Sequence, residues 1–143
     1  MSRATLFFAI MGFAFSFDPP TDDGFAGTPC AFSSEQMNYV RLIMVEAGVL
    51  SGDGFTQALE TPGLEVSEET LPARRFAYSE GHTTAAEAEF IARRLRAALD
   101  AGVVAELLSF FDEHPGAEQV TAWVEQFAAF NGQAATRAGY YAC

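Results

Sequence analysis

The chain contains no lysine, only two histidines and only two cysteines. Histidine and cysteine supply most metal ligands and most nucleophile–base pairs in proteins, so this sequence can build few such sites. There is no C-x-x-C pair, and Cys30 and Cys143 are far apart in the sequence. A P-loop, a Gly-x-Ser-x-Gly motif and a protein-kinase motif set are also absent. The sequence therefore assigns no catalytic, cofactor-binding or metal-ligating residue.

The few cysteines and histidines leave three narrower alternatives open. Cys30 with His82 as its base would form a nucleophile pair, but residues 28–32 carry no protease-like signature. A histidine–carboxylate site, or a zinc site from His82, His114 and an acid, lacks a supporting His-x-x-x-His spacing. Cys30 and Cys143 would pair in an exported protein, whereas two free thiols in the cytoplasm is the preferred interpretation.

Basic charge is also scarce, because eight arginines stand against 19 acidic residues and give a net charge of −11. A field of this sign repels phosphate backbones and anionic membranes, so direct nucleic-acid binding is disfavoured. It favours a protein partner with a basic surface, although acidity also serves solubility alone. We expect Glu68, Glu69, Glu87 and Glu89 to be solvated charges near helix starts. The Asp22-Asp23 pair lacks the spaced oxygen ligands of a calcium loop.

Long hydrophobic runs are missing as well. The most apolar stretch, residues 5–17, is shorter than the about 20 residues that a transmembrane helix needs, so no membrane span is expected. Bulky and small side chains alternate over residues 13–17, which favours a buried β-strand. The alternative is a signal peptide over residues 1–16, because Arg3 precedes an apolar core. In that case the protein would be exported instead of cytoplasmic.

Helix signals are the strongest features that are present. Ser33 with Gln36 and Thr84 with Glu87 form capping boxes, which predict two helices that end near Gly48 and Gly102. The patterns over residues 103–113 and 119–138 predict two more helices. The last has Trp123, Phe127 and Phe130 on one face, and Gly132 within it marks either a kink or a close helix contact. The remaining predictions are a loop over residues 18–32, a short helix over 55–60, strands over 64–66 and 76–79, a turn at 80–81 and a terminal strand over 139–143.

The second half of the chain resembles a recurring piece of small uncharacterised bacterial proteins. In residues 78–88, running into 91–95, a polar-glycine turn and a capping segment open an alanine-rich helix. Residues 123–130 and the Gly139-Tyr140 pair resemble the aromatic helix and glycine–aromatic ending of those proteins. Residues 37–40 depart from them, because an aromatic-rich first helix is expected there. The resemblance implies an architecture and no chemistry.

These features predict one globular domain over residues 1–143, of α+β class and predominantly helical. About four helices pack around Leu95, Leu107 and the aromatic residues of the last helix, beside a small sheet from the N-terminal strand and the C-terminal tail. The expected function is a small acidic non-catalytic protein that acts by protein–protein interaction, as an immunity, inhibitor or accessory protein. The alternatives are an acidic nucleic-acid mimic that blocks a basic groove, and a small enzyme that uses Cys30 or a histidine–carboxylate site.

Overall fold

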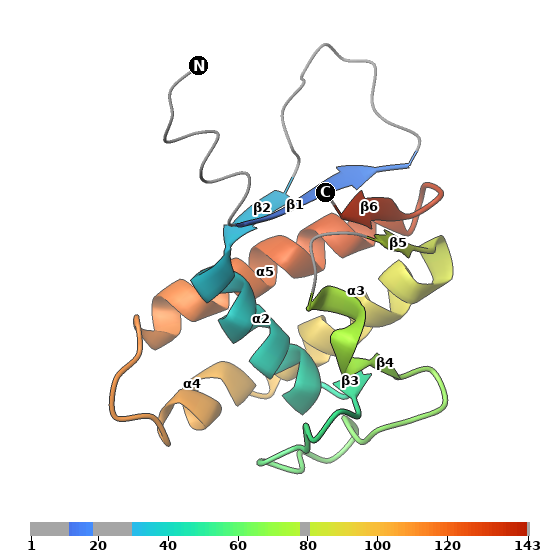
Figure 1. The fold of residues 1–143 in the computed structure, drawn as a ribbon. Coiled ribbons are helices and arrows are strands. Elements are labelled where there is room, and N and C mark those ends of the chain that lie inside the picture. The colour runs from blue at the N-terminus through green and yellow to red at the C-terminus, as the bar shows by residue number, and fades with distance from the viewer. Residues whose placement is uncertain (1–11, 19–29, 78–80, 143) are drawn as a thin grey trace, which may run out of the picture.

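The computed structural model of the chain describes residues 12–18, 30–77 and 81–142. A four-stranded antiparallel sheet lies over α5, and the other helices lie on the same side of the sheet (Figure 1). The α+β class predicted from the sequence is confirmed. The elements are β1 (Gly12–Phe17), β2 (Cys30–Ser33), α2 (Ser34–Glu46), β3 (Leu50–Ser51), β4 (Leu71–Pro72), η1 (Ala73–Phe76), β5 (Gly81–Thr83), α3 (Ala85–Asp100), α4 (Val103–Leu108), α5 (Ala117–Ala134) and β6 (Tyr140–Ala142).

The N-terminal strand β1 lies inside the sheet, whose order is β2-β1-β6-β5. Phe15 and Phe17 of β1 are buried and Phe13 is partly buried, so the alternation of bulky and small residues does mark a strand with one core face. The C-terminal strand β6 pairs antiparallel with β1, which confirms the prediction for the tail. Residues 5–11 of the predicted strand lie outside the described residues.

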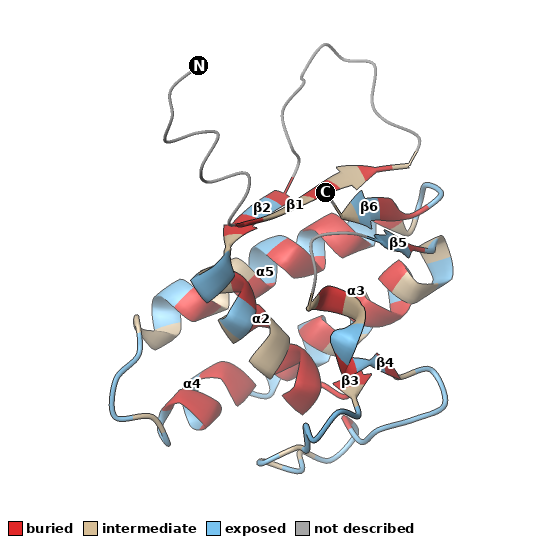
Figure 2. Ribbon diagram, in the orientation of Figure 1, coloured by how far each residue is buried: buried red, intermediate tan, exposed pale blue. Residues whose placement is uncertain are grey.

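Aromatic rings fill the space between the sheet and α5. The ring of Phe15 lies 5.3 Å from that of Phe127 and 5.7 Å from that of Tyr140. Phe17 stacks on Phe130 at 4.7 Å. Burying a large apolar side chain contributes roughly 1.5–3 kcal/mol, so this cluster is a main source of stability. Buried residues recur along every helix and along β1 (Figure 2).

Both predicted capping boxes are present. The Ser33 hydroxyl accepts the N–H of Gln36 at 3.1 Å, and the Gln36 side chain accepts the N–H of Ser33 at 2.9 Å. Thr84 and Glu87 make the same reciprocal pair at the start of α3. After α2 the chain turns at Gly48, whose φ of +73° suits glycine. These helix boundaries were predictable because the caps are local interactions.

The loop between β3 and β4 contradicts two local predictions, because residues 55–60 are not helical and residues 64–66 are not a strand. A buried side chain holds this loop instead. The carboxylate of Glu46, 3 % exposed, accepts the N–H of Ala58 at 2.6 Å and the N–H of Leu59 at 3.0 Å. The side chain of Gln57 donates to the carbonyl of Leu64 at 2.6 Å. These long-range bonds replace the helical ones.

Four strands were not predicted. β3 and β4 are two residues long each and pair with one another in parallel. β2 falls within the predicted loop and β5 begins at the predicted turn, yet β2 pairs with β1 and β5 pairs with β6. The predicted strand over residues 76–79 is wrong at Phe76, which ends the 3-10 helix η1, and residues 78–80 lie outside the described residues. Strand pairing depends on distant partners, so short segments of this kind carry little local signal.

The last two helices end earlier than predicted. α4 stops at Leu108, and the N–H groups of Phe110 and Phe111 bond three residues back in a tightened turn. α5 stops at Ala134, because the chain then turns toward the sheet and the N–H of Ala138 bonds to the carbonyl of Asp18 at 2.9 Å. A Cβ at Gly132 would meet no atom within 4 Å, so this glycine makes no close helix contact.

Candidate functional site

Cys30 does not have the environment of a reactive thiol. The residue is 1 % exposed, and Gln126 Nε2 lies 3.9 Å from its sulfur. Burial raises the pKa of the thiol to about 12, and the Gln126 hydrogen bond offsets only part of that rise. A nucleophilic or metal-binding cysteine needs the thiolate form and access to its substrate. The geometry therefore does not favour the cysteine enzyme. Cys143 lies outside the described residues.

The structure does not bring His82 to Cys30. The two residues lie on the opposite edge strands of the sheet, β5 and β2. His82 Nε2 instead lies 3.1 Å from Asp18 Oδ2, and its ring centroid lies 4.5 Å from that of Tyr141. This contact forms a histidine–carboxylate pair, and both side chains are about one-third exposed. It is a surface ion pair when the imidazole is protonated, and such pairs contribute little to stability.

His114 has a local structural role in the connection between α4 and α5. Its Nδ1 accepts the backbone N–H of Gly116 at 3.1 Å, two residues along the chain. Over the described ranges 12–18, 30–77 and 81–142, no three His, Cys, Asp or Glu side chains are grouped so that they could hold a metal ion. The zinc alternative of His82, His114 and an acid gains no support there.

One shallow groove, with a volume of about 310 Å³, combines acidic side chains with arginine partners. Glu68, Glu69 and Glu87 are among its lining residues. Arg75 donates to both oxygens of Glu87, at 2.9 and 3.0 Å. Burial by itself would raise the pKa of Glu87, but the Arg75 hydrogen bond, a bond from the Thr84 N–H and the guanidinium charge lower it overall. Glu87 is therefore paired within the groove, and Glu69 has a more distant partner in Arg93 Nη2, at 3.5 Å.

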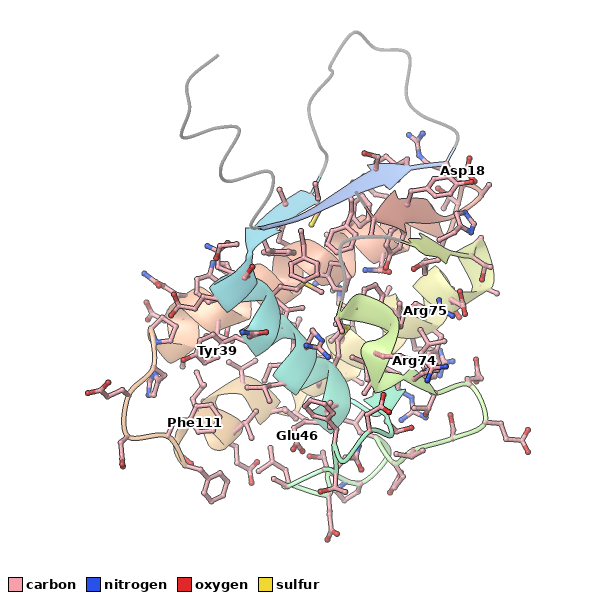
Figure 3. The ribbon with its side chains drawn as sticks, viewed as in Figure 1. Asp18, Tyr39, Glu46, Arg74, Arg75 and Phe111 are labelled. Carbon is pink, nitrogen blue, oxygen red and sulfur yellow. The ribbon has the colours of Figure 1, made fainter. Side chains whose placement is uncertain are left out.

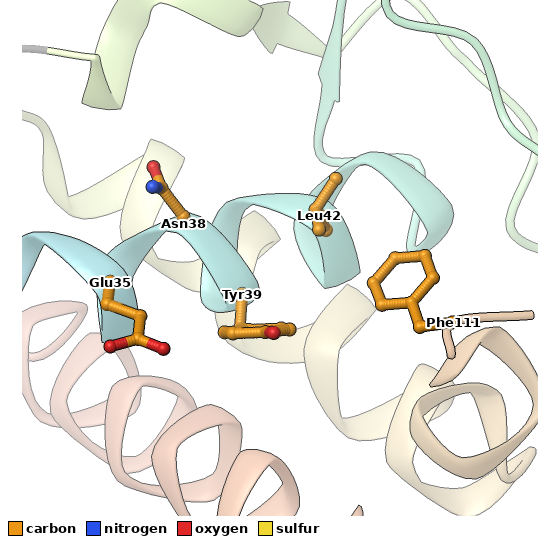
Figure 4. Close-up of a pocket in the computed structure, with 5 residues that line it drawn as sticks. All are labelled: Glu35, Asn38, Tyr39, Leu42 and Phe111. Carbon is orange, nitrogen blue, oxygen red and sulfur yellow. The ribbon is translucent and has the colours of Figure 1, made fainter. Parts of the chain in front are cut away.

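A second groove is lined almost entirely by polar and aromatic groups without a basic partner. It has a volume of about 250 Å³ and lies along one face of α2 (Figure 4). Four of its residues are spaced by three or four positions, which places them on one side of the helix. The fifth comes from the segment after α4. The lining residues are Glu35, Asn38, Tyr39, Leu42 and Phe111. We call this feature the Tyr39 groove.

Tyr39 is the central aromatic residue of this groove. Its ring centroid lies 6.5 Å from that of Phe111 and 6.2 Å from that of Trp123, and all three residues are only partly buried. Phe110, next to Phe111, is 68 % exposed. Trp123 was expected in the core, and its partly buried position beside Tyr39 was not predicted. The sequence pattern could not separate the two cases, because partly and fully buried rings recur at the same helical spacing.

The segment that supplies Phe111 and Trp123, the aromatic neighbours of Tyr39, is acidic. Residues 97–136 contain no arginine or lysine, and their acidic residues are all exposed: Asp100, Glu106, Asp112, Glu113, Glu118 and Glu125. We call α4, α5 and their connection the acidic half. Most of the described arginines lie instead on η1 and α3: Arg74, Arg75, Arg93, Arg94 and Arg96. In Figure 3, Tyr39 and Phe111 lie on one side of α2, and Arg74 and Arg75 lie on the other.

Comparison of the chain with protein-family models, with curated proteins and with solved structures found no match. The structure itself shows a small α+β protein that has an acidic half and, beside it, the Tyr39 groove. None of the helices among the described residues is long and apolar enough to cross a membrane.

Proposed function

We propose that this protein is a non-catalytic binding protein whose acidic half recognises a protein partner with a basic surface. The observation that carries the proposal is the run of residues 97–136, which has six exposed acidic side chains and no arginine or lysine. Complementary fields of this kind steer a basic partner toward one face and set its orientation. The exposed ring of Phe110, within the same run, adds apolar area for contact.

Solubility alone explains this distribution less well. A protein that charge keeps soluble needs charged residues spread over its surface. Interspersed positive and negative residues give solubility equally well. Here three arginines of η1 and α3 are paired with acids or carbonyl groups: Arg75 with Glu87, Arg93 with Glu69 and Arg94 with the carbonyl of Glu65. The acids of residues 97–136 have no arginine or lysine within their own segment, and the same is true of residues 42–73. Residues 97–136 differ in that Phe111 and Trp123 lie beside the ring of Tyr39, and this combination of acidic and aromatic surface supports a directional role.

Affinity capture from the native cell extract at low salt tests the proposal. The wild-type chain is compared with a variant that carries Asp112→Asn, Glu113→Gln and Glu118→Gln. The matched control carries Asp53→Asn, Glu60→Gln and Glu68→Gln, which remove the same charge from exposed positions outside the acidic half. We expect the wild type and the control to retain one stoichiometric partner, and the first variant to lose it. The binding should also weaken as salt shortens the Debye length from about 10 Å at 0.1 M.

Two results would contradict the proposal. One is the absence of a stoichiometric partner at low salt. The other is equal capture of a partner by both variants, because net charge and not the acidic half would then explain binding. The narrower version, an acidic mimic of nucleic acid, predicts in addition that double-stranded DNA or RNA releases the captured partner in competition.

A further inference from the structure

We infer that the Tyr39 groove is the anchor of this recognition surface, and that it binds a single arginine or lysine side chain presented by a basic segment of the partner. The inference rests on the proposed function, since it names the point at which the basic surface engages the chain. The observation that supports the inference is the lining of the groove, which combines aromatic rings with a carboxylate and is bordered by the acidic half (Figure 4).

The size of the groove selects a side chain over a larger ligand. Its volume is about 250 Å³. Sites for drug-sized molecules and cofactors run from about 300 to 1,000 Å³ and enclose most of the ligand. The Tyr39 groove lies open along α2, so it suits one long side chain that enters from a bound segment.

The lining matches the two ends of an arginine or lysine side chain. Leu42 and Phe111 offer apolar surface for the aliphatic stem. The Tyr39 ring, whose centroid lies 6.2 Å from that of Trp123, offers an aromatic face for the cationic head. Glu35, at the other end of the groove, supplies a carboxylate for a charge-assisted hydrogen bond. An acidic side chain would be repelled by that carboxylate, and an apolar side chain would gain nothing from it.

The protein itself uses the same pairing elsewhere. Arg137 lies over the ring of Phe17 at 4.5 Å, and Arg41 lies over Phe55 at 5.7 Å. Within the described part of the chain, no arginine lies over Tyr39, Phe111 or Trp123.

Arg41, the one basic residue of α2, cannot fill the groove, because its guanidinium donates to the carbonyl of Ala73 at 3.1 Å on another side of the helix. The aromatic face of the groove therefore has no cation from its own helix. Residues 97–136, which border it, contain no arginine or lysine either. Since no arginine of the described residues lies over this face, we assign its cation to a partner.

Trp123 provides a direct reporter, because it is the only tryptophan of the chain and lies beside Tyr39. The probe is a capped hexapeptide of alternating arginine and leucine. The matched probe replaces each arginine with citrulline, which keeps the shape and removes the charge. We expect a saturable change in Trp123 fluorescence with the arginine peptide, and at least tenfold weaker binding of the citrulline peptide. Calorimetry confirms the affinities.

Two substitutions localise the binding. Glu35→Gln removes one exposed charge without a change in shape, and we expect it to weaken the binding of the arginine peptide about three- to tenfold. Tyr39→Leu keeps an apolar side chain but removes the aromatic face, and we expect at least a tenfold loss. Val66→Ser changes an apolar residue that is 54 % exposed in the loop between β3 and β4, and should bind as the wild type does. Far-ultraviolet circular dichroism checks that each variant is folded.

Three outcomes would overturn the inference: no response of Trp123, equal affinity of all variants, or self-association that Tyr39→Leu abolishes, which would assign the groove to a second copy of the chain. The capture experiment separates this failure from failure of the proposed function. If Tyr39→Leu retains the partner and the three-acid variant loses it, the acidic half is correct and the groove is not its anchor.

Discussion

Buried polar side chains each connect two segments of the fold. Glu46 accepts two backbone N–H groups of the loop after β3. Asn131, fully buried in α5, donates to the carbonyl of Phe127 at 2.8 Å and accepts the Tyr140 hydroxyl at 2.8 Å. A buried polar group that loses its partner costs about 1–3 kcal/mol. These contacts give the buried polar residues hydrogen-bond partners within the core.

Cys30 gives the first test at this scale. Its pKa of about 12, against an ordinary 9.0, corresponds to about a thousandfold less thiolate at pH 8. In a Cys143→Ser variant, we expect iodoacetamide to alkylate Cys30 at least a hundredfold more slowly in the native protein than in urea, since burial adds to the low thiolate fraction. Mass spectrometry follows the reaction.

Equal rates in the native and unfolded protein would contradict the buried environment of Cys30. A fast native reaction would also restore the cysteine enzyme as a serious alternative, because an accessible thiolate is the first requirement of that chemistry.

At the scale of elements, local signals predicted the helices and distant contacts decided the rest. The boxes at Ser33 and Thr84 fix the starts of α2 and α3 within a few residues, so the sequence alone predicts them. β2 and β5 have four and three residues and depend on partners far along the chain. Their pairing could not be predicted from propensity. The same holds for residues 55–60, which form a loop held by Glu46 instead of the predicted helix.

Gly48, which joins α2 to β3, provides a test of how that loop is held. Its φ is +73°, and a Cβ there would overlap the carbonyl oxygen of Leu64. We expect Gly48→Ala to lower the free energy of unfolding by about 2 kcal/mol or more, from the left-handed backbone together with the clash. Urea unfolding measures the loss.

Gly54→Ala is the matched control for that substitution. Gly54 has a similar φ of +85°, but a Cβ there would meet no atom within 4 Å. We therefore expect the backbone cost alone, about 1 kcal/mol. Equal losses at the two positions would mean that the loop can move away from Gly48, and that the contact with Leu64 does not hold it.

At the scale of the whole molecule, the candidate surface combines one feature that the sequence contains plainly and one that it does not. The absence of arginine from residues 97–136 can be seen directly in the sequence. It produces an acidic surface only because α4 and α5 pack together in the fold. The Tyr39 groove was not predictable, because it forms only where α2 faces Phe111 and Trp123. The net acidity of the chain predicts that the partner has a basic surface. The fold indicates the side of the molecule on which we propose that this partner binds.

Hydrogen–deuterium exchange of the full chain, free and with its captured partner at low salt, tests the central claim most directly. The account predicts added protection in peptides from residues 34–43 and 103–125, which cover the Tyr39 groove and the acidic half. Peptides from β1 and from the loop between β3 and β4 should exchange as in the free protein. Protection concentrated on the sheet or on that loop, with none in α4 and α5, would contradict the account.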